Sequence, residues 1–147
     1  MIAPALVGMP VFQGLVATHV DLPVIAHPSY AGSTRVASPL LLGKLFRWLG
    51  ADAVIFPNFG GRFAYTREEC ARIAANHRRE WAGYRPTLSV VGGGLTLERV
   101  PEVVEFYGTD LMLLIGGALL APADKLAEKT RALVAAVERL PLSAPKV

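Results

Sequence analysis

Apolar runs and amphipathic segments alternate along the chain. Continuous apolar runs, without a polar residue at every second position, are typical of strands that are buried on both faces of a parallel sheet. Short runs bounded by glycine, proline and other turn residues favour strands over helices. The expected strands are 1–6 (MIAPAL), 22–27 (LPVIAH), 52–57 (DAVIFP), 87–91 (TLSVV) and 110–115 (DLMLLI).

Helical patterns fill the intervals between these strands. The expected helices are 10–19, which has the weakest signal, 38–50, 66–83, 100–108 and 124–140. Ser38 is suited to cap the second of them, with Pro39 in its first turn. Thr66 and Glu69 have the spacing of a capping box, and Asp124 is the expected cap of the last helix. Strict alternation of strand and helix predicts βαβ units, and therefore an α/β fold with parallel strands.

The length and composition fit a single domain with a large apolar core. The chain has 147 residues, and we expect residues 1–140 to form the domain and residues 141–147 a loose tail. Hydrophobic residues make up 52% and charged residues 18%, which suits a buried parallel sheet. The net charge is +3 and no block of basic residues occurs, so the sequence does not indicate a nucleic-acid partner.

The expected compartment is the cytoplasm. Cys70 is the single cysteine, which excludes an internal disulfide and fits a reducing environment. The N-terminal stretch MIAPALVGMP has no basic region and only a short apolar part, so it is a poor signal peptide. No apolar run is long enough to cross a membrane, and no membrane partner is expected.

Two glycine clusters follow the last two expected strands. Sites in parallel α/β sheets form where strands end and helices begin, and glycine there lets backbone N–H groups approach a ligand closely. Helix N-termini at the same edge favour an anion. We therefore expect a phosphate site that is built from both clusters, with tight turns that bind no ligand as the alternative. The candidate phosphate-binding residues are Gly93, Gly94, Gly116 and Gly117.

Three further residues are candidates because they lie at or just after strand ends. His27 ends the strand 22–27, where barrel enzymes place catalytic groups, and a buried, hydrogen-bonded histidine is the alternative. Arg62 follows the strand 52–57 and is able to bind a phosphate or carboxylate, or else to be a plain surface arginine. Asn58 is a polar lining residue of the same substrate site or a turn residue.

Several motifs together resemble one known family. The segment SVVGGGLTLERVPEVVEFYGTDLMLLIGGAL (89–119) resembles the last two strands of the RuBisCO large-subunit barrel. The segments LPVIAHPSYAG, LLLGKLFRWLGADAVIFPNFGGRF and YTREECARIA resemble RuBisCO-like proteins more closely than the carboxylases. The resemblance runs from residue 1 to about residue 140. It implies that the chain is the C-terminal portion, strands 4–8 with their helices, of a (β/α)8 TIM barrel.

The resemblance also implies a reaction class and a cofactor. Enzymes of this family abstract a proton next to a carbonyl of a phosphorylated sugar or methylthio-sugar. Mg²⁺ stabilises the enolate, and the outcome is enolisation, isomerisation or decarboxylation. The resemblance places the carbamate lysine and the acidic magnesium ligands before this portion, and the chain contains no Lys-x-Asp-Glu cluster. We therefore expect no metal ligand in this chain and no activity of the chain alone.

Departures from the carboxylases point away from ribulose bisphosphate. Pro28 stands where carboxylases have an arginine, and the strand AVIFP lacks their histidine. Arg62 stands where they carry a mobile catalytic lysine, and an arginine stays charged and does not replace a proton donor. His27 corresponds to a histidine of the family that contacts substrate. The expected function is that of the phosphate-binding part of a RuBisCO-like enzyme.

Two alternatives are also compatible with the sequence. One is a truncated, non-catalytic fragment, at most an anion-binding half-barrel. The other is an unrelated phosphate-handling barrel enzyme that is represented by half a barrel. In each case the exposed sheet edges predict a homo-oligomer or a complementary half-barrel as the partner, besides a phosphorylated small molecule.

Overall fold

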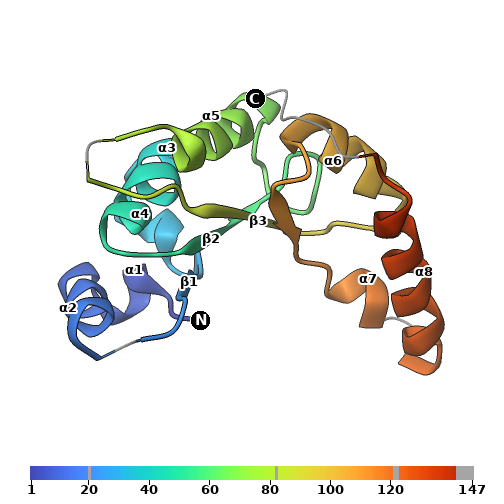
Figure 1. Cartoon of the computed structure of the whole chain (residues 1–147), viewed down its shortest axis with the longest axis horizontal. Coiled ribbons are helices and arrows are strands. Elements are labelled where there is room, and N and C mark those ends of the chain that lie inside the picture. Colours follow the sequence, from blue (N-terminus) through green and yellow to red (C-terminus); the bar gives the residue numbers. More distant parts are fainter. Residues whose placement is uncertain (20, 82, 121–122, 142–147) are drawn as a thin grey trace.

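The sheet has four parallel strands within the residues that the structure describes, which are 1–19, 21–81, 83–120 and 123–141 of this computed structural model (Figure 1). Parallel neighbours in chain order, connected through helices, are the arrangement of consecutive strands in a (β/α)8 barrel. The predicted α/β fold with parallel strands is therefore confirmed. The strands lie in the order β1 (Ile25–Ala26), β2 (Ala53–Pro57), β3 (Leu88–Gly92) and β4 (Leu111–Leu113).

The prediction of a strand over residues 1–6 is wrong in its length. Ile2 alone forms a parallel bridge to Ala26 on the outer side of β1, and the His27 N–H donates to the Ile2 carbonyl at 2.7 Å. Pro4 then begins helix α1 (Pro4–Val7). Proline has no N–H to give to a strand ladder, and its fixed φ suits the first turn of a helix. The sheet therefore starts with a one-residue bridge.

Helices fill the connections between the strands, as expected. Helices α3 and α4 belong to one continuous helix, because a five-residue π-turn at Leu41–Leu45 joins them with helical dihedral angles at both junctions. The weakly signalled helix at 10–19 is present as α2. The bounds are α2 (Met9–His19), α3 (Ser38–Leu40), α4 (Phe46–Trp48), α5 (Arg67–Arg78), α6 (Val100–Tyr107), α7 (Gly117–Leu120) and α8 (Leu126–Glu138), with 3₁₀ turns at Ala31–Thr34, Leu97–Arg99 and Ala123–Lys125.

One of the three expected helix caps forms. The Glu69 N–H donates to the Thr66 hydroxyl at 3.1 Å, and the Thr66 N–H donates to the Glu69 carboxylate at 2.9 Å, which is a complete capping box. The prediction that Ser38 caps its helix is wrong, because the Ser38 hydroxyl donates to the Tyr65 hydroxyl and makes no capping hydrogen bond in the described structure. Asp124 is also wrong, because a 3₁₀ turn precedes α8 and moves its cap to Lys125.

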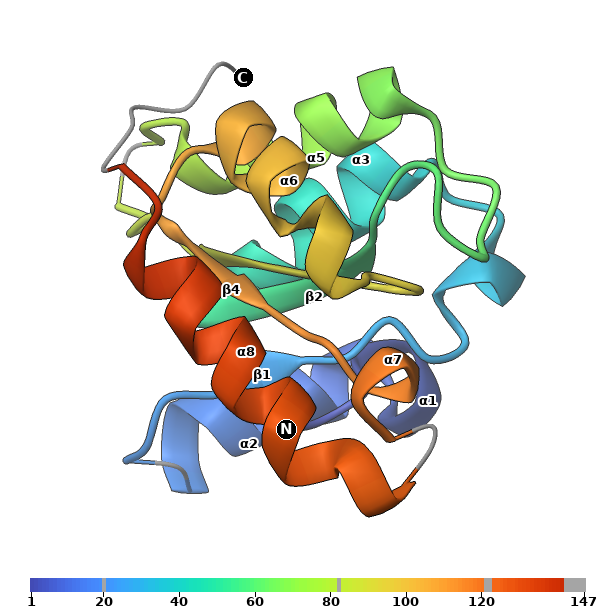
Figure 2. The same cartoon turned by 90° about the vertical axis from the view of Figure 1, so that its right-hand side faces the viewer.

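The core lies between the sheet and the helices that cover one of its faces. Helices α3, α5 and α6 lie along this face, whereas α1 and α2 extend beyond β1, and α7 and α8 beyond β4 (Figures 1 and 2). Val54 and Phe56 of β2 belong to the large cluster on the helix side. Ile55 and Val90 belong to a smaller cluster on the other face. None of the described helices is long and apolar enough to span a membrane.

Candidate functional site

A cavity of about 530 Å³ lies at the carboxyl ends of the strands, and we call it the strand-end cavity. Parallel strands bring their carboxyl ends to one edge of the sheet, so residues distant in sequence meet there. The loop after β1 contributes residues 27–32, β2 and its loop contribute residues 55–57, 62, 63 and 65, and Gly93 and Leu114 follow β3 and β4. Three of the expected site residues therefore share this cavity: His27, Arg62 and Gly93.

His27 is half-buried in the wall of the strand-end cavity. Its Nδ1 accepts the Ser29 backbone N–H at 3.1 Å and lies 2.7 Å from the Ser29 hydroxyl. A backbone N–H can only donate, so Nδ1 carries no proton and the neutral ring holds its proton on Nε2. The imidazole is therefore oriented by the loop after β1, with Nε2–H left as a donor for an oxygen.

Arg62 is held beside the first glycine cluster by its backbone. The Arg62 N–H donates to the Gly93 carbonyl at 3.1 Å, and the Asn58 N–H donates to the Gly92 carbonyl at 2.8 Å. The Arg62 side chain is exposed, with its guanidinium 5.0 Å from the centre of the Phe63 ring. A cation on a fixed backbone at the mouth of a cavity suits a phosphate or carboxylate.

Gly93 and Gly94 allow two loops to pack together. Both have positive φ, +85° and +99°, which disfavours any other residue. A Cβ at Gly93 would lie 3.2 Å from the Pro57 Cα, and a Cβ at Gly94 would lie 3.1 Å from the Arg62 nitrogen. These two glycines are therefore required for the contact between the loops after β2 and β3.

The second glycine cluster is in open surroundings. A Cβ at Gly116 or Gly117 would meet no atom of the described residues within 4 Å. The Gly116 carbonyl accepts the N–H groups of Leu119 and Leu120, so it is part of the first turn of α7. The wall of the strand-end cavity reaches Leu114 but contains neither of these glycines. The structure thus brings the first cluster, and not the second, to His27 and Arg62.

Asn58 lies beneath its loop and not in the wall of the strand-end cavity. It is fully buried, and its Oδ1 accepts the Tyr107 hydroxyl of α6 at 2.8 Å. Cys70 lies in the same buried region, where its Sγ is 3.4 Å from the Pro57 carbonyl oxygen, and burial raises the pKa of this thiol.

The sequence did not predict two residues that support the site. Ser29 orients His27, and Tyr107 holds Asn58. No local sequence pattern indicates a role in the site for either residue.

Magnesium does not fit the donors of the strand-end cavity. Mg²⁺ prefers carboxylate and other oxygen ligands, often with several waters. The cavity wall contains no aspartate or glutamate. Among the described residues, no three His, Cys, Asp or Glu side chains come close enough together to hold a metal ion. The described residues of this cavity therefore supply no magnesium site.

The chain is similar in sequence and in structure to known proteins. Ribulose bisphosphate carboxylase-like protein 1 of Rhodopseudomonas palustris is 52% identical over 128 residues, which are 87% of this chain and 35% of that protein. The 5-methylthioribulose-1-phosphate isomerase of Rhodospirillum rubrum is 48% identical over 137 residues, which are 93% of this chain and 37% of that protein. The crystal structure of a Rubisco-like protein from Rhodopseudomonas palustris matches with a TM-score of 0.85 and 39% identity.

The structural match covers 97% of this chain and 38% of that crystallised chain. The chain spans just over a third of the length of the curated relatives it matches. No protein-family model matches it. The four strands and their helices are therefore part of the larger α/β fold of these proteins. The chain belongs to the RuBisCO large-chain superfamily, and its homologues there are the RuBisCO-like proteins.

Proposed function

We propose that the strand-end cavity binds a phosphorylated sugar or methylthio-sugar, and that the chain is the phosphate-binding part of a RuBisCO-like enzyme. The reaction class is enolisation or isomerisation next to a carbonyl. The observation that carries the proposal is the convergence of His27, Arg62 and Gly93 on one cavity at the carboxyl edge of a parallel sheet. The identity to a protein named 5-methylthioribulose-1-phosphate isomerase supports the substrate class.

Each side chain has a role that its chemistry permits. Arg62 supplies a permanent positive charge and forked donors for the phosphate or for a negatively charged substrate oxygen. His27 donates its Nε2–H to a sugar or carbonyl oxygen, with Ser29 fixing the ring. Gly93, Gly94, Gly116 and Gly117 are proposed to present backbone N–H groups to the phosphate. The open space around Gly116 and Gly117 supports this for the second cluster.

We propose that these residues bind the substrate and do not hold the magnesium ion of the reaction. Mg²⁺, in the complete enzymes of this family, stabilises an enolate. The cavity wall offers no carboxylate to hold the ion. This same observation favours a second candidate function for the chain by itself, namely binding of an anion without catalysis.

The proposed compartment is the cytoplasm. Cys70 is the single cysteine and is buried as a free thiol. A buried thiol of raised pKa is mostly protonated and reacts slowly, which suits a structural role in a reducing environment.

Calorimetric titration of the protein, in the assembly in which it is isolated, tests the proposal. The ligands are inorganic phosphate and 5-methylthioribulose 1-phosphate. Arg62→Gln should weaken both affinities about tenfold or more, because charge-assisted hydrogen bonds contribute about 1.5–3 kcal/mol. Gly117→Val should weaken phosphate binding, because its side chain would fill the open space in which the second glycine cluster is proposed to meet the phosphate.

The matched control is Arg72→Gln on the exposed face of α5, which should bind like the parent protein. Failure of the parent to bind the sugar phosphate, or an unchanged affinity in Arg62→Gln, would overturn the proposal.

A further inference from the structure

The loop that carries Arg62, residues 58–63, is held at its inner end by a buried hydrogen bond. The Tyr107 hydroxyl donates to the Asn58 Oδ1 at 2.8 Å, and both side chains are fully buried. Burial raises the pKa of the Tyr107 phenol, so it remains protonated and able to donate. A buried acceptor that loses its only donor costs more than the bond itself contributes, so this contact fixes Asn58 to α6.

The next residue of the loop, Phe59, is held by contacts with an aromatic ring and with two arginines. Its ring lies edge-on to Phe106 at 4.9 Å, and the Arg67 guanidinium stacks over it at 4.4 Å. The Phe59 carbonyl accepts the Arg99 Nη2–H at 3.0 Å. Glu102 pairs with both arginines, at 3.4 Å to Arg67 and 3.1 Å to Arg99, and so keeps the two cations in place.

The outer part of the loop rests on the Arg99 side chain and on the loop after β3. A Cβ at Gly60 would lie 3.2 Å from the Arg99 Nη2, so the guanidinium lies directly against the backbone. A Cβ at Gly61 would overlap the Gly93 carbonyl oxygen. The Arg62 N–H bonds to that same carbonyl at 3.1 Å. The loop is thus fixed through α6, through Arg99 and through the neighbouring loop, whereas the Arg62 side chain remains exposed.

We infer that residues 58–63 form a fixed arm and not a closing lid, and that Tyr107 and Arg99 are positioning residues that hold Arg62 at the strand-end cavity. The inference rests on the proposed function in that Arg62 is taken as the anion ligand. An arm that is already in place loses little conformational entropy when an anion binds, which favours affinity. Tyr107 and Arg99 act through the loop and are not among the residues that line the cavity, although the Tyr107 ring lies edge-on to Phe56 of the cavity wall, with 5.9 Å between the ring centres.

Amide hydrogen exchange of the protein, with and without inorganic phosphate, tests the fixed arm. In the parent the Asn58 and Arg62 amides should exchange slowly, and phosphate should change their rates less than threefold. Tyr107→Phe should raise the exchange of both amides at least tenfold, while the amides of Ile55 and Val90 in the sheet change far less. Phosphate affinity should fall about fivefold in the same variant.

Arg99→Lys provides a second variant. The Arg99 side chain is 23% exposed, so a lysine can be accommodated there. The lysine keeps the positive charge but loses the forked contact that the arginine makes with Phe59 and Glu102. It should loosen the Arg62 amide more than the Asn58 amide. The controls are Tyr84→Phe and Arg131→Lys, which replace exposed side chains of other elements and should leave loop exchange and phosphate affinity at the parent values.

Two results would overturn the inference. One is a parent loop that exchanges freely and becomes at least tenfold more protected when phosphate binds, because this is how a closing lid behaves. The other is parental exchange of residues 58–62 in both Tyr107→Phe and Arg99→Lys. Absence of phosphate binding in the parent would contradict the proposed function alone, since the exchange rates of the variants would still decide whether the arm is fixed.

Discussion

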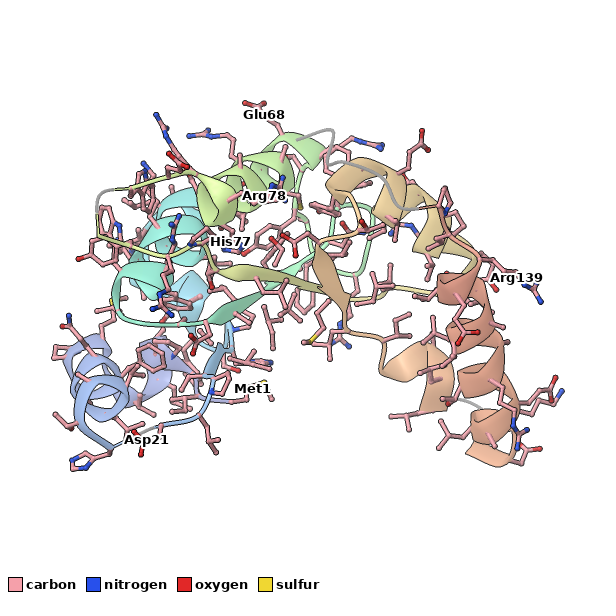
Figure 3. All side chains as sticks on the ribbon, in the orientation of Figure 1. Met1, Asp21, Glu68, His77, Arg78 and Arg139 are labelled. Atoms are coloured by element: carbon pink, nitrogen blue, oxygen red, sulfur yellow. The ribbon has the colours of Figure 1, made fainter. Side chains whose placement is uncertain are left out.

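His77 makes the stability of the fold depend on pH. The imidazole is fully buried on the sheet side of α5, whereas Glu68 of the same helix points away from the sheet (Figure 3). Its Nε2 lies 3.0 Å from the Leu42 carbonyl and its Nδ1 lies 2.9 Å from the Ser89 hydroxyl. The neutral ring satisfies both contacts by donating from Nε2 and accepting at Nδ1. Burial lowers the pKa of His77 to about 4 from 6.5.

The sign of the pH effect follows from this lowered pKa. The unfolded chain takes up a proton on His77 below pH 6.5, whereas the folded chain resists it until about pH 4. The neutral ring therefore makes its full contribution to the free energy of unfolding above pH 6.5. This contribution, about 3 kcal/mol in total, is lost as the pH falls toward 4.

Urea unfolding between pH 7.5 and 4.5 measures this dependence. Its control is His77→Gln, an uncharged amide that is expected to be less stable at pH 7.5 and to lose less stability on acidification. Equal pH dependence in parent and variant would show that His77 is not responsible.

Gly61 is expected to tolerate no side chain. A Cβ there would overlap the Gly93 carbonyl oxygen. Gly61→Ala should lower the free energy of unfolding by about 1–3 kcal/mol and weaken phosphate binding, since the loop must separate from Gly93. Gly14→Ala is the matched control, because a Cβ at Gly14 meets nothing within 4 Å in the middle of α2. Urea unfolding of the two variants decides this, and equal stability would contradict the close packing.

Arg47 fixes the turn between α5 and β3. The side chain is 3% exposed and donates to four backbone carbonyls and to no carboxylate of the described residues. It also stacks on Trp81, with 4.9 Å to the ring centre. The forked guanidinium reaches acceptors that are spread from residue 76 to residue 85, and a lysine ammonium cannot reach them all. The accepting residues are Asn76, Arg79, Tyr84 and Arg85, at 2.6–2.9 Å.

Arg47→Lys should therefore destabilise the protein although the charge is kept. The expected loss is about 3 kcal/mol in the free energy of unfolding, because buried carbonyls are left without donors. Thermal and urea unfolding measure it. Arg72→Lys on the exposed side of α5 is the control and should differ from the parent by less than about 0.5 kcal/mol. A loss of similar size in both variants would contradict the role of Arg47.

The sequence predicts elements well where a local pattern decides them. The strands at β2 and β3 and the capping box at Thr66 follow from residues that are close together in the chain. The prediction of a strand at 1–6 is wrong because Pro4 cannot donate to a strand ladder and instead begins a helix. The apolar pattern alone does not show whether such a segment forms a strand or a helix. The last helix starts late because a 3₁₀ turn competes with the Asp124 cap.

The candidate site is predictable only in part, for the same physical reason. His27, Arg62 and Gly93 follow strand ends, and the topology of a parallel sheet brings strand ends together. The contact between Asn58 and Tyr107 joins residues 49 positions apart, and it depends on how α6 packs on the sheet. No periodicity or motif reports such a contact, so the support beneath the loop becomes visible only in the structure.

Both ends of the sheet are open. β4 has β3 as its single neighbour in the described sheet, and Ile2 lies alone outside β1. An apolar cavity of about 560 Å³ lies between β4, α6 and α8. Met112 and Val134 in its wall are 41% and 50% exposed. Unpaired strand edges and exposed apolar surfaces of this kind mark sites of association.

We expect the chain to associate through this edge. Four parallel strands cannot close as a barrel does, because strand number, tilt and stagger are linked. The chain should therefore pair with another copy of itself or with a complementary half-barrel, or else aggregate. Light scattering of the purified chain at micromolar concentration should give a mass above that of the monomer.

Charged substitutions locate the associating surface. Met112→Lys together with Val134→Lys should shift the chain toward the monomer mass, because a desolvated charge at an apolar contact costs several kcal/mol. Leu40→Lys, at a similarly exposed position (42%) on α3, should leave the mass unchanged. A folded, monodisperse monomer of the parent chain would mean that side chains of the end strands seal the edges by themselves. An equal shift in the control would place the contact on another face.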